Sequence, residues 1–146
     1  MEAQINTENI NKKIKLNFKD SKYATGRRKK SIAKVWVKKG SGIIHVNGKK
    51  MADYFQKTSL QKAIFRPLIL VKRENEFDVR CSVNGGGLTG QAGAIILGIS
   101  RAIIQFEPEL KSTLKKEKLT TRDSRIVERK KYGHRKARRS FQFSKR

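Results

Sequence analysis

Charge is distributed unevenly along this chain of 146 residues, and the distribution limits which part can fold. Residues 1–39 hold 12 basic and 3 acidic residues, and residues 111–146 hold 15 basic and 3 acidic residues. Between them, residues 40–110 hold 9 basic and 6 acidic residues. A nearly neutral middle can bury a core, whereas strongly basic ends repel themselves and favour a polyanionic partner. The sequence therefore predicts one folded unit between two basic arms.

The formal net charge of +24 narrows the classes of partner and site. Nucleic acid is the first candidate, and an anionic membrane surface is the alternative. No apolar run reaches the roughly 18 residues of a membrane span, and the amino-terminus lacks the apolar core of a signal peptide. The lone Cys81 excludes an internal disulfide and a cysteine-based zinc site, and neither His45 nor His134 has acidic neighbours in a cluster. We expect a nucleic-acid binder in a reducing compartment, with no metal and no cofactor.

Alternation of apolar and polar residues predicts four short strands in the middle of the chain. They are expected over residues 31–39, 43–48, 68–71 and 76–84. Turn residues between the first two favour a hairpin, and the last two are expected to form a second one. In the last strand the apolar side chains share one face, so Cys81 is interpreted as a small core residue, with a reactive thiol as the alternative.

Apolar residues at three- and four-residue intervals predict the helices. Two short helices are expected between residues 49 and 66, divided at Thr58, and Pro67 is expected to end the second. The longest apolar stripe covers residues 88–106 and is wide enough to pack on a sheet. Its glycines each cost about 1 kcal/mol relative to alanine, so this helix is expected to lie very close to the sheet or to another backbone. A short charged helix is predicted after Pro108.

The residues before the long helix match a dinucleotide-binding pattern. Gly85, Gly87 and Gly90 fit G-x-G-x-x-G between a strand and a helix. A Rossmann unit also needs a second parallel strand, and a lysine-rich polar segment follows here instead. Two compatible interpretations remain for the turn: a tight connection with positive φ, or backbone N–H groups that approach an RNA phosphate. The turn comprises Gly85, Gly86, Gly87 and Gly90.

Two basic clusters are the candidates for contacts with RNA. The first, before the strand at residue 31, consists of Arg27, Arg28, Lys29 and Lys30, with an ordinary solvated turn as the alternative. The second comprises Arg122, Arg125, Arg129, Lys130, Lys131, Arg135, Lys136, Arg138 and Arg139. Arginine pairs bidentately with phosphate, and the interleaved Tyr132, Phe141 and Phe143 favour irregular RNA over duplex DNA. A nonspecific basic tail is the alternative here. No serine, histidine and acid are arranged as in a hydrolase, so an enzyme is not expected.

Apolar residues become sparse after Leu119, and the arms are not expected to fold by themselves. Ordering the last 28 residues would cost on the order of 30–55 kcal/mol of backbone entropy. A handful of apolar side chains cannot offset this cost. The predicted organisation is a disordered extension over 1–22, a globular α+β RNA-binding domain over 23–118 and an extended basic tail over 119–146.

Four segments of the sequence carry a specific resemblance. They are "YATGRRKKSIAKV", "VNGGGLTGQAGAI", "GISRA" and "TRDSRIVERKKYGHRKARRSFQFSKR". Together they resemble the bacterial-type small-subunit ribosomal protein nine family, from Tyr23 to the end of the chain. Residues 1–22 match nothing in the family core.

The resemblance implies an α+β fold with a four-stranded sheet, helices packed on it and a left-handed β-α-β crossover, like the second domain of ribosomal protein five. It implies a place in the head of the small ribosomal subunit, on 16S-type ribosomal RNA and beside other head proteins, with no membrane and no small-molecule substrate. It also implies that the tail extends to the peptidyl (P) site. There Ser144, Lys145 and Arg146 would contact the anticodon stem-loop of the bound tRNA. A cytoplasmic bacterial ribosome is expected, and an organellar origin stays open.

Overall fold

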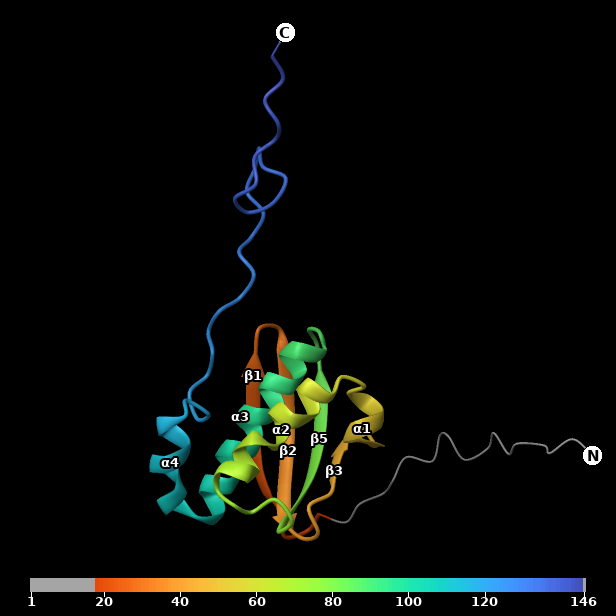
Figure 1. The fold of residues 1–146 in the computed structure, drawn as a ribbon, viewed down its shortest axis with the longest axis vertical. Helices are drawn as coiled ribbons and strands as arrows, with labels where there is room; N and C mark the ends of the chain where they lie inside the picture. Colours follow the sequence, from red (N-terminus) through yellow and green to blue (C-terminus); the bar gives the residue numbers. More distant parts are fainter. Residues whose placement is uncertain (1–17, 146) are drawn as a thin grey trace, which may run out of the picture.

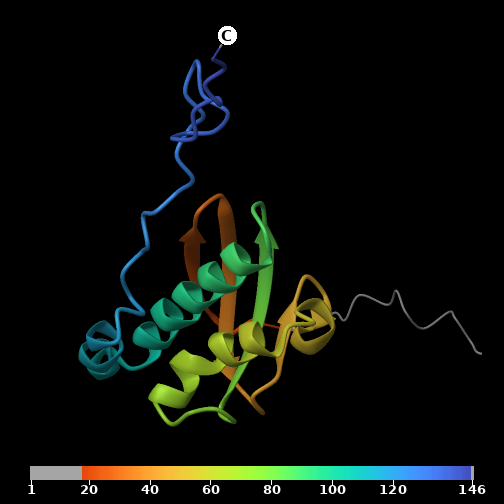
Figure 2. The ribbon, with the colours of Figure 1, turned by 45° about the horizontal axis from the view of Figure 1, so that its top comes forward.

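The computed structural model describes residues 18–145, and most of the predicted amino-terminal extension lies outside this range. Its centre is a sheet with the strand order β1-β2-β5-β3-β4 (Figure 1). The strands are β1 (Lys22–Arg28), β2 (Ser31–Lys39), β3 (Ile44–Val46), β4 (Lys49–Lys50) and β5 (Phe77–Asn84). The helices are α1 (Met51–Tyr54), α2 (Thr58–Leu70), α3 (Leu88–Phe106), a 3-10 turn (Pro108–Leu110) and α4 (Lys111–Lys116). Helices α2 and α3 lie on one face of the sheet, so the protein has a mixed α+β fold with an open sheet (Figure 2).

The sheet has five strands in the described part of the chain, and the expected four-stranded sheet is wrong in detail. Strand β1 was not predicted, although it pairs antiparallel with β2 along its whole length. Its inward residues are Ala24 and Gly26, which are too small to produce an apolar alternation. They are small because α3 passes directly over them: a Cβ on Gly26 would lie 1.8 Å from the carbonyl oxygen of Ala94.

The predicted hairpin between residues 31–39 and 43–48 is also wrong. Strand β3 pairs parallel to β5, with Val46 opposite Cys81, and β5 lies between β3 and β2. Strand β5 is the antiparallel neighbour of β2. A turn sequence restricts local backbone geometry, whereas the choice of partner strand depends on burial across the whole chain.

Residues 68–71 were predicted as a strand, but α2 continues through Pro67 to Leu70. The apolar run has a second interpretation as part of a helical stripe, in which Ile64, Pro67 and Leu68 are the buried residues. Short apolar runs do not distinguish a buried strand from a buried helix. The predicted division near Thr58 is confirmed, because α1 and α2 are separate helices.

Strands β3 and β5 and the helices between them form a β-α-β crossover. In Figure 1 both strands run upward, α2 passes in front of the sheet, and β5 lies to the left of β3. This arrangement is a left-handed crossover, whereas the great majority of such units are right-handed.

Helix α3 has the predicted bounds, and its apolar stripe forms the centre of the core with β2 and β5. The expected close approach is confirmed: a Cβ on Gly98 would lie 2.5 Å from Cγ2 of Val35. Cys81 is 2% exposed, and burial raises the pKa of its thiol, so it remains protonated within the core. The interpretation of Cys81 as a core residue is therefore confirmed.

The Asp78 carboxylate joins the turn after β2 to strand β5. It accepts hydrogen bonds from the backbone N–H groups of Ser41 (2.8 Å) and Ile43 (3.1 Å). Burial raises the pKa of Asp78, but these hydrogen bonds outweigh it, and the net pKa is lowered. We expect Asp78→Ala to reduce the free energy of unfolding by about 1–2 kcal/mol at neutral pH, because two backbone donors lose their acceptor.

The pH dependence follows from the lowered pKa of Asp78. A carboxylate with a depressed folded-state pKa stabilises the fold above its unfolded pKa of about 3.9, and this stabilisation is lost as the pH falls through the folded pKa. Urea unfolding should therefore show a smaller difference between Asp78→Ala and wild type at low pH than at neutral pH. Glu74→Ala is the control: Glu74 is exposed in a loop, so this substitution should change the free energy of unfolding little at either pH. An equal loss at both pH values would argue against a role for the ionised carboxylate.

Candidate RNA interface

The fold brings the first basic cluster and the glycine turn to one end of the sheet. Lys29 and Lys30 form the two-residue turn between β1 and β2, and Lys29 has a φ of 53°. Gly85 lies against this turn, since a Cβ on Gly85 would be 2.5 Å from the carbonyl oxygen of Lys30. Both turns lie at the end of the domain past which the tail extends (Figures 1 and 2). The cluster was expected before the first strand, but Arg27 and Arg28 belong to β1 itself.

The interpretation of the glycine turn as a tight connection with positive φ is confirmed. Gly85 and Gly86 have φ values of 74° and 64°. The Ser31 hydroxyl donates a hydrogen bond to the carbonyl oxygen of Gly85 (3.0 Å), and it lies 2.1 Å from where a Cβ of Gly86 would be. No strand follows α3 in the described part of the chain, as the rejection of a Rossmann unit requires. Gly87 precedes α3 without a side-chain cap, and its carbonyl oxygen accepts a hydrogen bond from the N–H of Gln91 (2.9 Å).

Three residues that position the glycine turn were not predicted from the sequence. The Asn47 side chain accepts a hydrogen bond from the backbone N–H of Val83 (2.8 Å) at the end of β5. The Tyr54 hydroxyl donates to Oε1 of Gln91 (2.9 Å), and Nε2 of Gln91 donates to the carbonyl oxygen of Gly85 (3.2 Å). Tyr54 and Gln91 thus link α1 and α3 to the glycine turn, and no sequence motif marks these long-range bonds.

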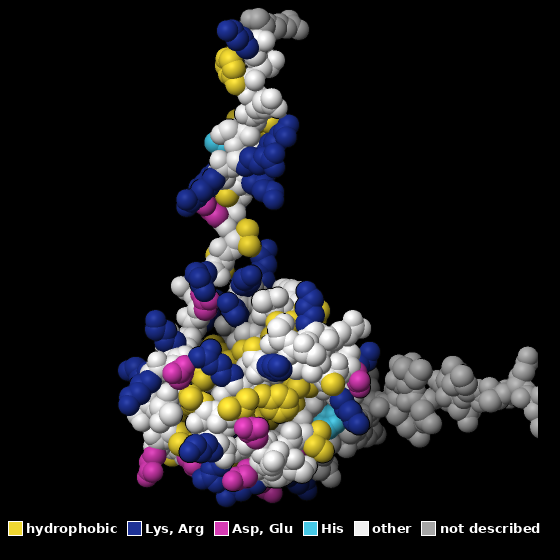
Figure 3. Space-filling view, viewed as in Figure 1, with side chains coloured by type: hydrophobic (Ala, Val, Ile, Leu, Met, Phe, Trp, Pro, Cys, Tyr) yellow, Lys and Arg dark blue, Asp and Glu magenta, His cyan; other side chains and the backbone are white. Residues whose placement is uncertain are grey.

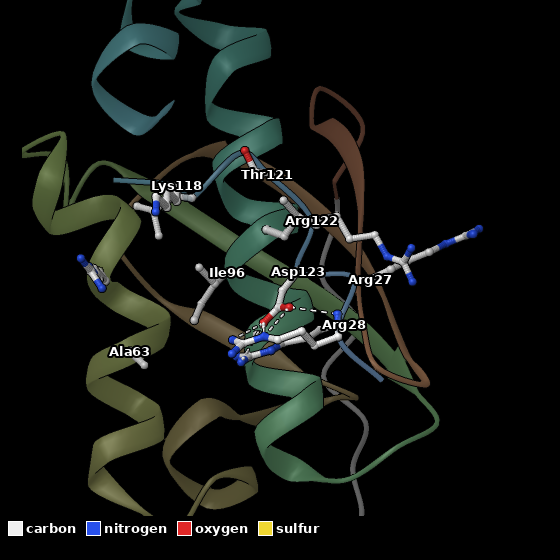
Figure 4. A pocket seen from close by; sticks show the side chains of 13 residues that line it. Arg27, Arg28, Ala63, Ile96, Lys118, Thr121, Arg122 and Asp123 are labelled. Atoms are coloured by element: carbon white, nitrogen blue, oxygen red, sulfur yellow. Dashed lines mark hydrogen bonds and ion pairs between the residues drawn. The ribbon is translucent and has the colours of Figure 1, made fainter. Parts of the chain in front are cut away.

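A groove of about 750 Å³ lies where β1, α2, α3 and the start of the tail meet. The Arg28 side chain lies in this groove against α3: a Cβ on Gly93 would be 2.3 Å from Cδ of Arg28. Its guanidinium pairs with Asp123 at 3.4 Å. Figure 4 shows this pair inside the groove and Arg27 directed away from it. The other basic residues that line the groove are Arg27, Arg66, Lys118, Arg122 and Arg125.

Asp123 connects the tail to the domain. Hydrogen bonds from the side chain and the backbone N–H of Arg125, with a smaller contribution from the charge of Arg28, hold the pKa of Asp123 well below its usual range. The carboxylate therefore stays ionised at neutral pH. One acidic residue thus keeps two arginines beside the groove, where a phosphate could approach them.

The folded core ends at the base of the tail. Leu119 donates its N–H to the carbonyl oxygen of Leu114 (3.0 Å), and Lys118 has a φ of 56°. These features form a Schellman-type helix end in which lysine takes the position usually held by glycine. Leu119, the first residue of the predicted tail, is 9% exposed and belongs to the core.

From Thr121 to Lys145 the chain contains no helix and no strand, and it leads away from the domain (Figure 1). All nine candidate basic residues of this segment are exposed. Figure 3 shows Lys and Arg side chains along the tail and around its base. Glu128 pairs with Lys131 (3.4 Å) and Arg138 (3.0 Å), so some of the positive charge is neutralised locally.

The tail contains a small loop that was not predicted. His134 and Ser140 form a single antiparallel bridge, and the N–H of Arg135 donates to the carbonyl oxygen of Arg139 (2.8 Å). The Arg135 guanidinium lies 5.5 Å from the ring centroid of Phe141. The loop presents the exposed side chains of Lys136, Arg138 and Arg139. Beyond it, Ser144 and Lys145 are exposed, and Arg146 lies outside the described residues.

Residues 18–145 contain no group of three or more His, Cys, Asp or Glu side chains placed to hold a metal ion. None of the helices within residues 18–145 combines the length and the apolar character needed to cross a membrane.

The comparison with known protein families agrees with the arrangement of basic surfaces. The family model for ribosomal protein S9/S16 matches residues 26–146, which include both basic clusters and the glycine turn. The match covers most of the chain and thus the domain together with its tail. The chain belongs to the ribosomal protein S9/S16 family and is a structural, rRNA-binding protein of the ribosome.

Proposed function

We propose that this protein is a bacterial-type S9 protein of the small-subunit head, bound to 16S-type rRNA and in contact with P-site tRNA through the tip of its tail. The observation that carries the proposal is the tail itself, a segment of exposed basic side chains without helix or strand from Thr121 to Lys145. Such a segment cannot bury enough apolar surface to order alone, and it is suited to a narrow path between RNA helices. A cytoplasmic ribosome beside other head proteins is the expected setting.

Two parts of the domain would hold the protein on rRNA. At the end of the sheet, Lys29, Lys30 and the glycine turn offer ammonium groups and backbone N–H groups to phosphates. At the base of the tail, Arg28 and Arg125 stand beside the groove, and arginine pairs with phosphate bidentately. In this proposal these contacts place the domain, and the tail extends from it.

The high-salt stability of the complex separates this proposal from a free-standing nonspecific binder. Nonspecific electrostatic binding weakens steeply with salt concentration. A structural component should remain with the small subunit through a sucrose gradient at high salt, whereas a loose binder should be removed. Release of the protein at moderate salt would count against the proposed place in the subunit.

The contact with tRNA predicts a measurable but modest effect. We expect removal of Ser144, Lys145 and Arg146 to weaken P-site tRNA binding by about tenfold, because the loss of one charge-assisted hydrogen bond costs about 1.5 kcal/mol at the lower end of its range. The measurement is tRNA affinity on small subunits reconstituted with truncated or intact protein.

The control for this experiment is Glu74→Ala, which changes charge far from the tail. Both proteins should incorporate equally into subunits. Unchanged tRNA affinity with normal assembly would limit the tail to an rRNA contact and would refute the proposed contact at the P site.

A further inference from the structure

The face of the sheet opposite the helices carries side chains of a particular chemistry. Helices α2 and α3 lie on one face (Figure 2), so alternate residues of β1, β2 and β5 point to the other. Strand pairing puts Tyr23 opposite Trp36 and Trp36 opposite Arg80. The three side chains therefore form one row across three strands. None of them belongs to the basic clusters or to the tail.

The side chains in this row contact one another and remain accessible. The rings of Tyr23 and Trp36 have their centroids 5.3 Å apart at an interplanar angle of 44°. The Arg80 guanidinium carbon lies 5.8 Å from the centroid of the Trp36 ring. Tyr23 is 43% exposed, and Trp36 is half-buried. Two adjacent aromatic rings and a guanidinium are thus held by the rigid backbone of a sheet.

The charge around the row is positive. Arg27 and Lys34 point to the same face from β1 and β2, as do Lys38 and Arg80. Among the strand residues on this face the acidic one is Asp78, and its carboxylate accepts hydrogen bonds from the backbone of the turn after β2. A polyanion therefore meets positive potential on both sides of the aromatic pair.

We propose that this helix-free face is a second RNA site, which binds a single-stranded segment of rRNA with bases stacked on Tyr23 and Trp36. Exposed aromatic rings on an open sheet stack with unpaired bases, and every base offers a π-face. Arg80 can stack on the same bases, while Lys34 and Arg27 lie within the same face to meet phosphates. The positive charge favours RNA over a protein surface as the occupant. The inference rests on the assignment of the chain as an rRNA-binding protein.

The first test identifies the occupant in the assembled particle. Small subunits are reconstituted with the full chain carrying Trp36→p-benzoylphenylalanine, and a second protein carries the same probe at Ile69, an exposed residue of α2 on the opposite face. Irradiation should cross-link position 36 to small-subunit rRNA. A cross-link from position 36 to a ribosomal protein, or none at all, would overturn the proposal. Incorporation of the protein into subunits is scored separately, and its failure would count against the proposed function instead.

The second test measures the contribution of stacking. Trp36→Ala should weaken rRNA binding roughly tenfold, whereas Trp36→Phe, which keeps a ring, should stay close to wild type. Ile69→Ala is the matched control for loss of an exposed apolar side chain. Trp36 is the only tryptophan of the sequence, so oligouridylate added to the full chain should quench its fluorescence.

The outcomes of the second test are distinct. Oligouridylate that binds without quenching Trp36, or a Trp36→Ala protein with wild-type affinity, would refute the site while leaving rRNA binding by the tail intact. Unfolding curves of each variant show whether it is folded. Trp36 lies outside the buried core, so we expect its substitutions to leave the fold intact.

Discussion

Neutralising four basic side chains of the tail is expected to weaken binding to small-subunit rRNA by roughly 100- to 1000-fold near 0.1 M salt. The substitutions are Arg129→Gln, Lys130→Gln, Lys136→Gln and Arg139→Gln. All four side chains are exposed, and none makes an ion pair within residues 18–145. Each phosphate contact releases counterions, so each lost contact should also reduce the slope of log K against log salt by about 0.7–0.9.

The matched control removes the same charge from elsewhere on the surface. It carries Lys57→Gln, Lys62→Gln, Lys72→Gln and Lys111→Gln, all exposed and outside both basic clusters. Filter binding across a salt series should show a small loss for the control and a shallower slope only for the tail variant. Equal losses in the two variants would mean that net charge, and not the tail, determines affinity.

Gly26→Ala is expected to reduce the free energy of unfolding by about 3–4 kcal/mol, a large effect for a single methyl group. The added Cβ would lie 1.8 Å from the carbonyl oxygen of Ala94 and 2.6 Å from the backbone nitrogen of Gly98. Both are backbone atoms of α3, so no side chain can rotate to make room. Strand β1 or helix α3 would have to move, and each packs against the rest of the core.

Gly87→Ala is the matched control, because a Cβ there would meet no atom within 4 Å and its φ is −114°. Urea unfolding of both variants gives the two free energies. A loss below about 1 kcal/mol for Gly26→Ala would show that β1 and α3 are not held at this distance. A large loss would also explain why α3 contains glycine: Gly98 lets the backbone of α3 approach Gly26 of β1 closely.

Local patterns were sufficient for some elements and misleading for others. The period of 3.6 residues identified α3 with its bounds, because a long helix repeats its signal many times. Residues 76–84 alternate strictly, and β5 follows them closely. By contrast, β3 has only three residues, so its sequence pattern was too short to predict that it pairs with β5. The apolar run at residues 68–71 fits a strand and a helix equally, and only its packing beside Ile64 decides for the helix.

For the functional surfaces, composition and motifs were enough to predict the chemistry: a polyanion binder with basic arms, a glycine turn, and motifs that resemble one ribosomal family. Which of these groups lie together follows from the fold. Pairing of β1 with β2 brings Tyr23 beside Trp36, and packing of the tail places Asp123 against Arg28. Composition and periodicity are local properties, and a single chain displays them directly. Contacts between distant residues depend on which pairing buries the most apolar surface while satisfying the backbone, and this balance exists only in the folded protein.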